Sequence, residues 1–389
     1  MAEPGRRAAP ILALGLLAGC VGIPVDPGPG DALSCADPAS GDACPETVPT
    51  SLADAFLRIS GTEEFSLSGK SVAAIDDLDG DGRSELLIGA SNVGQSRGRS
   101  YLFFSTGLAG GGDRSLDDAD VVISGLVAGG ASGRWVASAG DVDDDGRGDL
   151  LVGAHNAEDA AGVSYLLLGA DLAVGGLFDL SVAHATIRGD APFDHSGWGL
   201  ASAGDVDGDG LSDVIVGGYG DDTAGDGAGA AAVFFGSTLR LGGDFTVSQG
   251  DAVFLGAAAG DAFGRTVASL GDVDGDGRDD LLVGALGEDS GGSEAGAAYV
   301  FLASAVAQGG THGATEAWAT LRGEEAGDGV GFALAGAGDV DGDGVPEALV
   351  SAYRNDRAGR NAGATYVVFG ARIAAGGVVD LADADVTLL

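Results

Sequence analysis

Basic residues are scarce in this chain. Only 19 of its 389 residues are Lys or Arg, against 59 Asp and Glu, and the formal net charge is −40. Lys70 is the one lysine. A charge of this sign and size repels nucleic-acid phosphates and anionic lipid head groups, so we expect no nucleic-acid partner. Metal cations are the expected counter-ions.

Motifs of common catalysts are also absent. The four histidines, His155, His184, His195 and His312, form no HExxH pattern, and the sequence has no GxSxG turn, P-loop or CxxC pair. We therefore predict that the protein is not an enzyme. The 73 glycines follow no three-residue period and proline occurs only 10 times, which excludes a collagen-like chain.

Cysteine occurs three times, all near the N-terminus. Arg6 and Arg7 precede an apolar run too short to span a bilayer, so residues 1–19 read as a signal peptide. Leu17-Ala18-Gly19-Cys20 resembles the bacterial lipobox, which predicts cleavage before Cys20 and its lipidation. An ordinary secretory signal is the alternative. The expected location is outside the cytoplasm, anchored by lipid, and at the outer membrane or cell surface if the bacterium is diderm.

Residues 20–50 are rich in Pro and Gly and predict a tether rather than a packed domain. Cys35 and Cys44 lie in it, and in an exported protein a disulfide between them is the favoured interpretation, with metal binding as the weaker one. The remaining residues, 51–389, form the third and main unit.

This main unit contains five repeats. Similar acidic strings begin at Asp77, Asp141, Asp205, Asp272 and Asp339, spaced by 64, 64, 67 and 67 residues. Each string lies between short apolar runs rich in Val, Ile, Phe and Tyr, and two more such runs follow. Four short strands per repeat predict an all-β fold, a β-propeller with four-stranded blades.

The acidic strings predict calcium loops. In DxDxDGxxD, the side chains at positions 1, 3, 5 and 9 supply oxygen ligands, and glycine at position 6 permits a sharp turn. About five Ca²⁺ ions are expected. The predicted ligands are Asp77, Asp79, Asp81 and Glu85; Asp141, Asp143, Asp145 and Asp149; Asp205, Asp207, Asp209 and Asp213; Asp272, Asp274, Asp276 and Asp280; and Asp339, Asp341, Asp343 and Glu347.

The same strings resemble the start of an EF-hand loop, but the complete motif is absent. An EF-hand needs a bidentate Glu at position 12 and a helix on each side. Position 12 is instead apolar and lies in a strand-like run in every repeat, at Ile88, Val152, Val216, Val283 and Val350.

The segment from Phe263-Gly264 to Gly284-Ala285 resembles the FG-GAP repeat of the integrin α-subunit propeller and its bacterial relatives. The resemblance extends over about residues 52–389, with Ser66 where repeat one should have Gly and Gly133-Arg134-Trp135 in place of Phe-Gly. It implies that the calcium loops join the first two strands of each blade at one face, and that a protein or glycan ligand binds the opposite face.

Ring closure and function are the last expectations. Integrins have seven repeats and this chain has five, and both 53–60 and 382–389 look like a fourth strand. A closed five-bladed ring is favoured over an open or truncated array. The predicted function is a calcium-stabilised, lipid-anchored adhesion module, with Tyr219, Tyr353 and Arg354 as partner contacts. A structural envelope protein, or a polysaccharide lyase or hydrolase, is the alternative.

Overall fold

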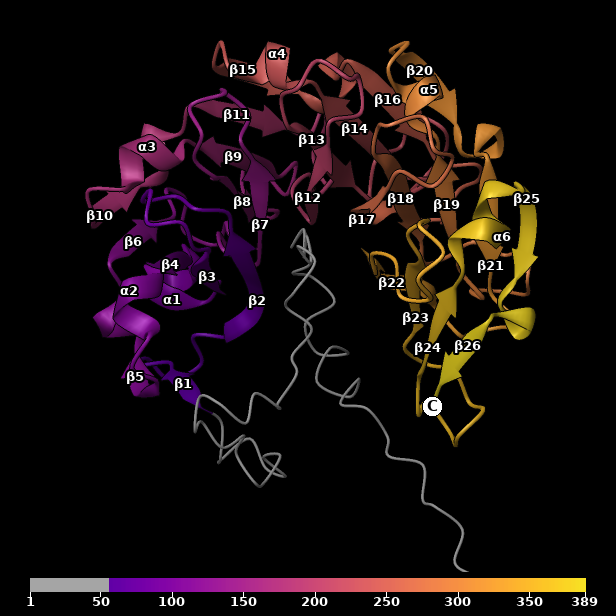
Figure 1. Ribbon diagram of the computed structural model, residues 1–389, viewed down its shortest axis with the longest axis horizontal. Helices are drawn as coiled ribbons and strands as arrows, with labels where there is room; N and C mark the ends of the chain where they lie inside the picture. Colours follow the sequence, from indigo (N-terminus) through magenta and orange to yellow (C-terminus); the bar gives the residue numbers. More distant parts are fainter. Residues whose placement is uncertain (1–55) are drawn as a thin grey trace, which may run out of the picture.

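A computed structural model describes residues 56–389 of the chain. The predicted signal peptide, Cys20, the tether and the Cys35–Cys44 pair lie outside the described residues. Five β-sheets of four or five strands follow one another along an arc, with the ends of the arc apart (Figure 1). The predicted all-β fold with blade-like sheets is thereby confirmed.

Each repeat supplies four strands that pair antiparallel with their neighbours in one sheet, which we call a blade. They are β2 (Ser68–Ile75), β3 (Glu85–Ala90), β4 (Arg99–Phe103) and β6 (Val121–Ser124) in blade 1; β7 (Trp135–Gly140), β8 (Asp149–Ala154), β9 (Val163–Leu167) and β11 (Ala185–Arg188) in blade 2; β12 (Gly199–Gly204), β13 (Asp213–Gly218), β14 (Ala230–Phe234) and β16 (Ala252–Leu255) in blade 3; β17 (Phe263–Gly271), β18 (Asp280–Ala285), β19 (Ala297–Phe301) and β21 (Ala319–Arg322) in blade 4; and β22 (Val330–Gly336), β23 (Ala348–Ala352), β24 (Ala364–Val368) and β26 (Val386–Leu388) in blade 5.

A fifth strand that the sequence did not predict completes four of the blades. It lies between the third and fourth strands of one repeat and pairs in parallel with the fourth strand of the preceding blade. These donated strands are β10 (Gly176–Asp179), β15 (Gly243–Thr246), β20 (Gly310–Gly313) and β25 (Gly377–Asp380). These strands have only four residues each and are largely exposed, so their sequences lack the alternating apolar residues by which a strand is recognised.

The helices are single turns in the connections. They are α1 (Val93–Ser96), α2 (Ser105–Leu108), α3 (Gly169–Leu172), α4 (Gly236–Leu239), α5 (Ala303–Val306) and α6 (Gly370–Ala374). A 3₁₀ turn directly follows each of β5, β10, β15, β20 and β25. Within residues 56–389, no helix has the length and apolar character needed to cross a bilayer.

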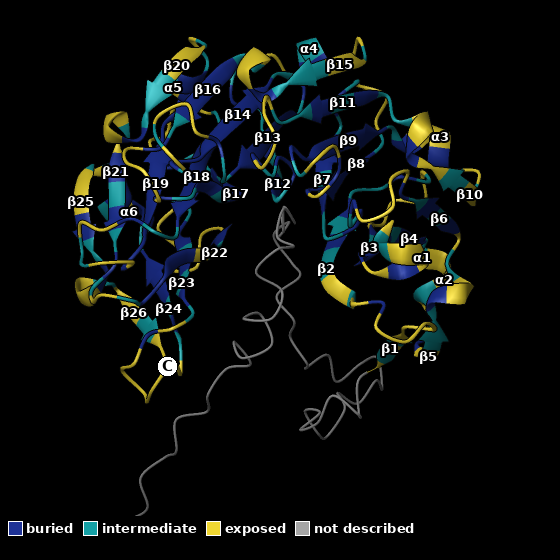
Figure 2. Cartoon of the chain, turned by 180° about the vertical axis from the view of Figure 1, so that it is seen from behind, coloured by how far each residue is buried: buried dark blue, intermediate teal, exposed yellow. Residues whose placement is uncertain are grey.

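The hydrophobic core is divided among the interfaces between blades. Along β8, Leu150 and Val152 pack with blade 1, and Leu151 between them packs with blade 3. Successive side chains on a strand point to opposite faces of the sheet, so a central blade covered on both sides needs an uninterrupted apolar run. Figure 2 shows these inner strands as buried. This explains why the strings read LLVGA rather than an alternating pattern.

Two glycines of the repeat allow neighbouring blades to come close together. A Cβ atom built on Gly217, in β13, would lie 1.8 Å from the carbonyl oxygen of Gly264 in the next blade. Gly264 itself has a φ of +78°, which favours glycine. Glycine is therefore needed at both positions because the backbones of neighbouring blades touch there.

The register in blade 1 corrects one sequence assignment. Val72 pairs with Ile88 as Val267 pairs with Val283, so the glycine equivalent to Gly264 is Gly69. Ser66, which the sequence analysis aligned with that glycine, precedes β2. The error arose because Phe65 imitates the Phe of the motif.

The predicted closed ring is not what the structure shows. The first strands β2, β7, β12, β17 and β22 pack in succession, but no comparable contact within residues 56–389 joins β22 to β2. β26 fills the fourth position of blade 5 by pairing with β24, which it follows directly in the chain. β1 (Leu57–Ser60) does not join blade 5; it pairs in parallel with β5 (Gly112–Ser115).

Candidate metal centres and the opposite face

Each acidic loop joins the first and second strands of a blade, and its first aspartate organises the turn. In blade 3, Asp205 accepts hydrogen bonds from the backbone N–H of Gly208 at 2.7 Å and of Gly210 at 3.0 Å. Both glycines have positive φ, +80° and +90°, a conformation that costs an L side chain energy. The two glycines thus let the backbone wrap around one carboxylate.

Carboxylate oxygens converge in all five loops. In each group one oxygen from every member lies within 4.8 Å of the others, close enough to share one cation. The groups are Asp77, Asp79 and Glu85; Asp141, Asp143 and Asp149; Asp205, Asp207 and Asp213; Asp272, Asp274 and Asp276; and Asp339, Asp341, Asp343 and Glu347.

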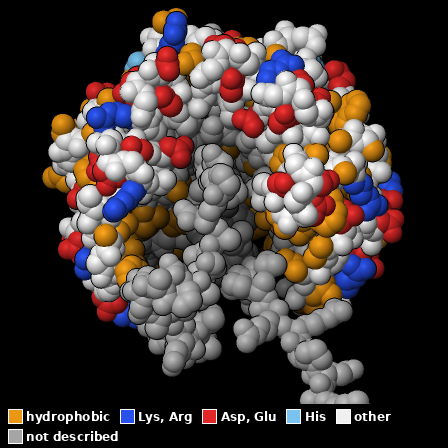
Figure 3. Space-filling view, in the orientation of Figure 1, with side chains coloured by type: hydrophobic (Ala, Val, Ile, Leu, Met, Phe, Trp, Pro, Cys, Tyr) orange, Lys and Arg blue, Asp and Glu red, His pale blue; other side chains and the backbone are white. Residues whose placement is uncertain are grey.

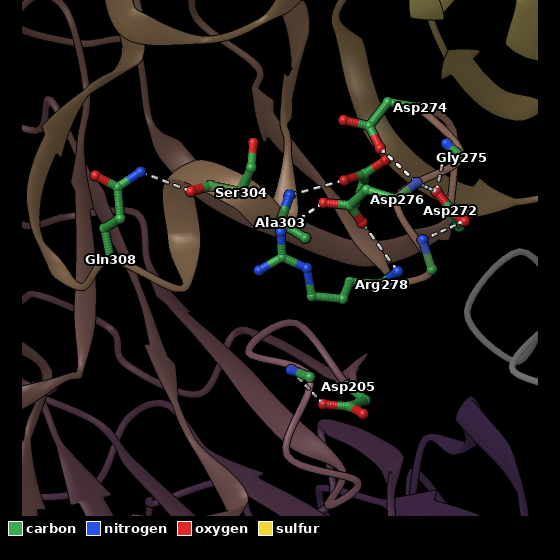
Figure 4. Close-up of polar contacts among 12 residues, drawn as sticks. Asp205, Asp272, Asp274, Gly275, Asp276, Arg278, Ala303, Ser304 and Gln308 are labelled. Carbon is green, nitrogen blue, oxygen red and sulfur yellow. Dashed lines mark hydrogen bonds and ion pairs between the residues drawn. The ribbon is translucent and has the colours of Figure 1, made fainter.

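Four of the twenty predicted ligands lie outside these groups: Asp81, Asp145, Asp209 and Asp280. Asp209 accepts a hydrogen bond from the backbone N–H of Leu211 at 2.8 Å. Asp280 accepts from the backbone of Val273 at 2.9 Å and of Ala303 at 2.7 Å, so both of its oxygens hold the loop to its own blade. Figure 4 shows Asp272, Asp274 and Asp276 beside Ala303 and Arg278, whose guanidinium donates to Asp276 at 2.5 Å.

The ninth residue of each loop is buried at the base of the site. Burial raises the pKa of Asp149 and of Asp213 to about 7, although backbone hydrogen bonds from the neighbouring strands act in the opposite direction. Burial raises the pKa of Glu85 to about 7 as well. Carboxylates in this condition gain most from a cation that compensates their lost hydration.

Two buried oxygens show that a cation fits the loops. Glu85 Oε1 and Asp143 Oδ1 are shielded from solvent and have no hydrogen-bond partner. An unpaired buried carboxylate oxygen is costly, and oxygen ligands of this kind are those that Ca²⁺ prefers. The residues present therefore match a hard divalent cation in their chemistry.

Neighbouring acidic loops contact one another through arginine. The guanidinium of Arg147, at position 7 of the blade 2 loop, donates to the backbone oxygen of Leu78 in the blade 1 loop at 2.5 Å. Between blades 4 and 3, the aliphatic part of the Arg278 side chain lies against Gly208. Acidic side chains gather around the inner hollow of the arc on the face drawn in Figure 3, and most Lys and Arg side chains on that face lie farther out.

The opposite end of each blade is fixed by strand register. Gly204 pairs with Asp213 beside the acidic loop, whereas Gly199 pairs with Gly217 at the far end of the same two strands. Trp198 and Tyr219, which flank those glycines, therefore lie at the end away from the acidic loop. The same reasoning holds for the loops before each first strand and after each second strand.

Aromatic side chains from these loops form one cluster. Trp198 contacts His155, Tyr219 and Trp135 with ring centres 4.6, 5.2 and 6.4 Å away. His195 stacks on Tyr219 at 4.9 Å and 6°. Tyr219, a predicted partner contact, is thus half-buried inside the cluster. Burial, supported by the positive charge of Arg134, lowers the pKa of His155 to about 4.

Two arginines that the sequence analysis did not select complete the cluster. The guanidinium carbons of Arg134 and Arg265 lie 4.7 and 4.9 Å from the ring centre of Trp198. Burial lowers the pKa of each guanidinium. The available signal was their shared place in the repeat, since each directly follows the glycine at the start of its first strand.

The other two predicted partner contacts lie in blade 5. Tyr353 packs against Phe332 at 4.4 Å, and the exposed Arg354 lies 4.8 Å from the ring of Tyr353. Arg354 also pairs with Glu294 at 3.3 Å. Arg265 lies 5.3 Å from the ring centre of Tyr219 and 5.9 Å from that of Phe332, so it links this pair to the cluster around Trp198.

Comparison with known proteins identifies the repeat. The FG-GAP repeat family matches residues 68–103 and 263–301, which are β2 to β4 and β17 to β19. The chain carries FG-GAP repeats. It is 33% identical to mouse integrin alpha-IIb over 175 residues, 42% of this chain and 16% of that protein, and equally similar to the human protein. Integrin alpha-5 of Xenopus laevis is 31% identical over 179 residues, 43% of this chain and 16% of that subunit.

The likeness is therefore local. The chain spans about a sixth of the length of these integrin subunits. It supports an integrin-α-like propeller repeat with acidic loops, and the activities of the much longer relatives do not follow from it.

Proposed function

We propose that this chain is a calcium-stabilised binding module that holds a protein or glycan partner on the face opposite its acidic loops. The observation that carries the proposal is the difference in side chains between the two ends of each blade. One end holds converging carboxylates in all five repeats, and the other holds aromatic and basic side chains that differ between repeats. A rigid scaffold with variable loops is the usual arrangement of a binding protein.

Calcium would be held by the grouped carboxylates, about one ion per loop. Its role would be to neutralise the loops and to fix the first two strands of each blade, because an ion that binds only the folded state stabilises that state. Asp207 and Asp213 support this role in blade 3, and Glu347 in blade 5.

The partner would meet Tyr219, Tyr353 and Arg354. Tyrosine and arginine are the side chains that most often anchor interfaces, and the exposed Arg354 is held in place by Tyr353 and Glu294. No residue is assigned a catalytic role. The lipobox-like segment supports a location outside the cytoplasm, where lipid on Cys20 would anchor the module to a membrane, at the outer membrane or cell surface if the bacterium is diderm.

The test is capture of a partner from surface proteins and glycans with the full chain, in calcium and after chelation. We expect calcium-dependent capture that Tyr353→Ala and Arg354→Ala each weaken by about tenfold without lowering the melting temperature. Capture by no protein or glycan would favour the structural envelope role instead. Detergent phase separation of wild type and Cys20→Ala tests the anchor, which fails if both partition alike.

A further inference from the structure

One position of the repeat carries a cation or an aromatic ring in every blade. It directly follows the glycine at the start of the first strand, and the first strands line the inner side of the arc (Figure 1). We call this set the inner-rim cluster; its members are Lys70, Arg134, Trp198, Arg265 and Phe332.

The members of the inner-rim cluster contact one another across blades. Arg134 of blade 2 and Arg265 of blade 4 both lie over Trp198 of blade 3, and Arg265 lies 5.9 Å from Phe332 of blade 5. The charge of Arg134 lowers the pKa of Lys70, so blade 1 belongs to the same electrostatic environment. Three positive charges are thus gathered along the inner side of a chain whose net charge is −40.

Among residues 56–389, no Asp or Glu oxygen lies within ion-pair distance of Lys70, Arg134 or Arg265, whereas Arg188 contacts both Glu158 and Asp244. Partly buried cations that repel one another are costly when unpaired. In a chain with 59 acidic residues, their isolation within residues 56–389 leaves them able to bind a carboxylate from elsewhere.

We propose that the inner-rim cluster binds carboxylates of an acidic polypeptide segment, which deepens and rests on the proposed binding function. A guanidinium stacked on a ring keeps its in-plane N–H donors free, and their fork matches a carboxylate in a bidentate manner. A cation of this kind is more specific for carboxylate than a solvated surface lysine.

The contacts favour a polypeptide over an acidic polysaccharide. Sugar rings bind proteins largely by packing on open aromatic faces. Here the rings already have neighbours: Trp198 meets two arginines, Tyr219 stacks with His195, and Phe332 packs on Tyr353. The remaining binding capacity is the set of guanidinium and ammonium donors, which suits consecutive Asp or Glu side chains.

The test uses fluorescence anisotropy of a labelled oligo-aspartate peptide with the full chain at saturating calcium. The same peptide with asparagine at every position is the control for charge. We expect binding of the oligo-aspartate alone, weakened by about tenfold or more in Arg134→Gln and in Arg265→Gln. Arg240→Gln, which removes an exposed charge beyond α4, should bind as wild type does. Arg265→Lys keeps the charge and should recover only part of the affinity, because it lacks the fork.

Several outcomes would overturn the inference. One is equal binding of the aspartate and asparagine peptides; another is unchanged affinity in the folded double variant Arg134→Gln/Arg265→Gln, with folding checked by thermal melting. Stronger arginine-dependent binding of polygalacturonate would assign the site to a polysaccharide. Failure here leaves the proposed function intact if partner capture still depends on Tyr353 and Arg354. Oligo-aspartate binding by a chain that captures no partner would support the inner-rim cluster as a carboxylate site and contradict the proposed function.

Discussion

The imidazole of His155 meets the indole of Trp198 edge to face, with ring centres 4.6 Å apart and planes at 84°. His155 follows β8 in blade 2, and Trp198 precedes β12 in blade 3. The histidine is buried, its Nδ1 has no hydrogen-bond partner, and Arg134 lies nearby. This contact between blades therefore requires an uncharged imidazole.

The first prediction is a loss of stability on acidification. Because the pKa of His155 is lowered to about 4 in the folded state, the unfolded chain binds more protons between pH 4 and its ordinary value near 6.5. Stability should rise with pH through this window and fall on acidification. In His155→Phe, the difference in unfolding free energy between pH 7 and pH 5 should shrink by about 2 kcal/mol, measured by urea titration.

A matched control for that experiment is His184→Phe, which changes a histidine just before β11. It should keep the pH dependence of wild type. If His155→Phe and wild type lose stability equally on acidification, the imidazole is not the responsible group.

The second prediction separates grouped from ungrouped carboxylates in one loop. Asp207 belongs to the converging set of blade 3, whereas Asp209 lies outside it, although each accepts a backbone hydrogen bond. Asp207→Asn should therefore lower calcium affinity and the melting temperature in calcium more than Asp209→Asn does. A bound ion at a hundredfold excess over its Kd contributes about 2.7 kcal/mol. Calorimetric titration measures the affinities, and the reverse order would contradict the grouping.

The third prediction concerns the one loop with aspartate at position 4. Asp144 has a φ of +63°, where the equivalent Gly208 has +80°. Asp144→Gly relieves this strain and should raise the unfolding free energy by up to about 1 kcal/mol in the presence of calcium. Gly208→Asp should lower it by a similar amount, since it introduces the same strain in blade 3. A loss of stability in Asp144→Gly would show that the aspartate side chain matters more than its backbone.

The fourth prediction tests close packing between blades. A methyl group at Gly217 would overlap the carbonyl oxygen of Gly264, so Gly217→Ala should lower the unfolding free energy by roughly 1–3 kcal/mol. Gly110→Ala is the matched control, because a Cβ there meets nothing within 4 Å. Equal melting temperatures for the two variants would mean that the blades separate at little cost.

Local patterns in the sequence predicted the blades and the acidic loops well. DVDGDG strings determine a turn by chemistry within a few residues, and uninterrupted runs such as 149–154 require a sheet covered on both faces. The carboxylates that stay outside the groups could not be recognised, because Asp209 and Asp280 occupy the same motif positions as the grouped Asp276 and Asp213 and accept the same backbone hydrogen bonds.

Features that depend on several blades were missed. Arg134, Trp198 and Arg265 come together only because successive blades stack in register, and nothing near any one of them in the sequence marks the contact. Ring closure failed as a prediction for a related reason. Residues 53–60 and 382–389 have similar strand sequences, and the sequence alone does not show that β26 pairs with β24 whereas β1 pairs with β5.

The donated strands impose an order on the folding of the blades during synthesis. Blade 1 obtains its outer strand, β10, from repeat two, and each later blade through blade 4 likewise waits for the repeat behind it. As the chain emerges from the ribosome or a translocation channel, no blade among these four can be finished until much of the next has appeared. Blades should therefore be completed in order from the N-terminal side, each about one repeat after its own synthesis. Until then, the unpaired edge strand of the most recent blade is open to wrong pairing.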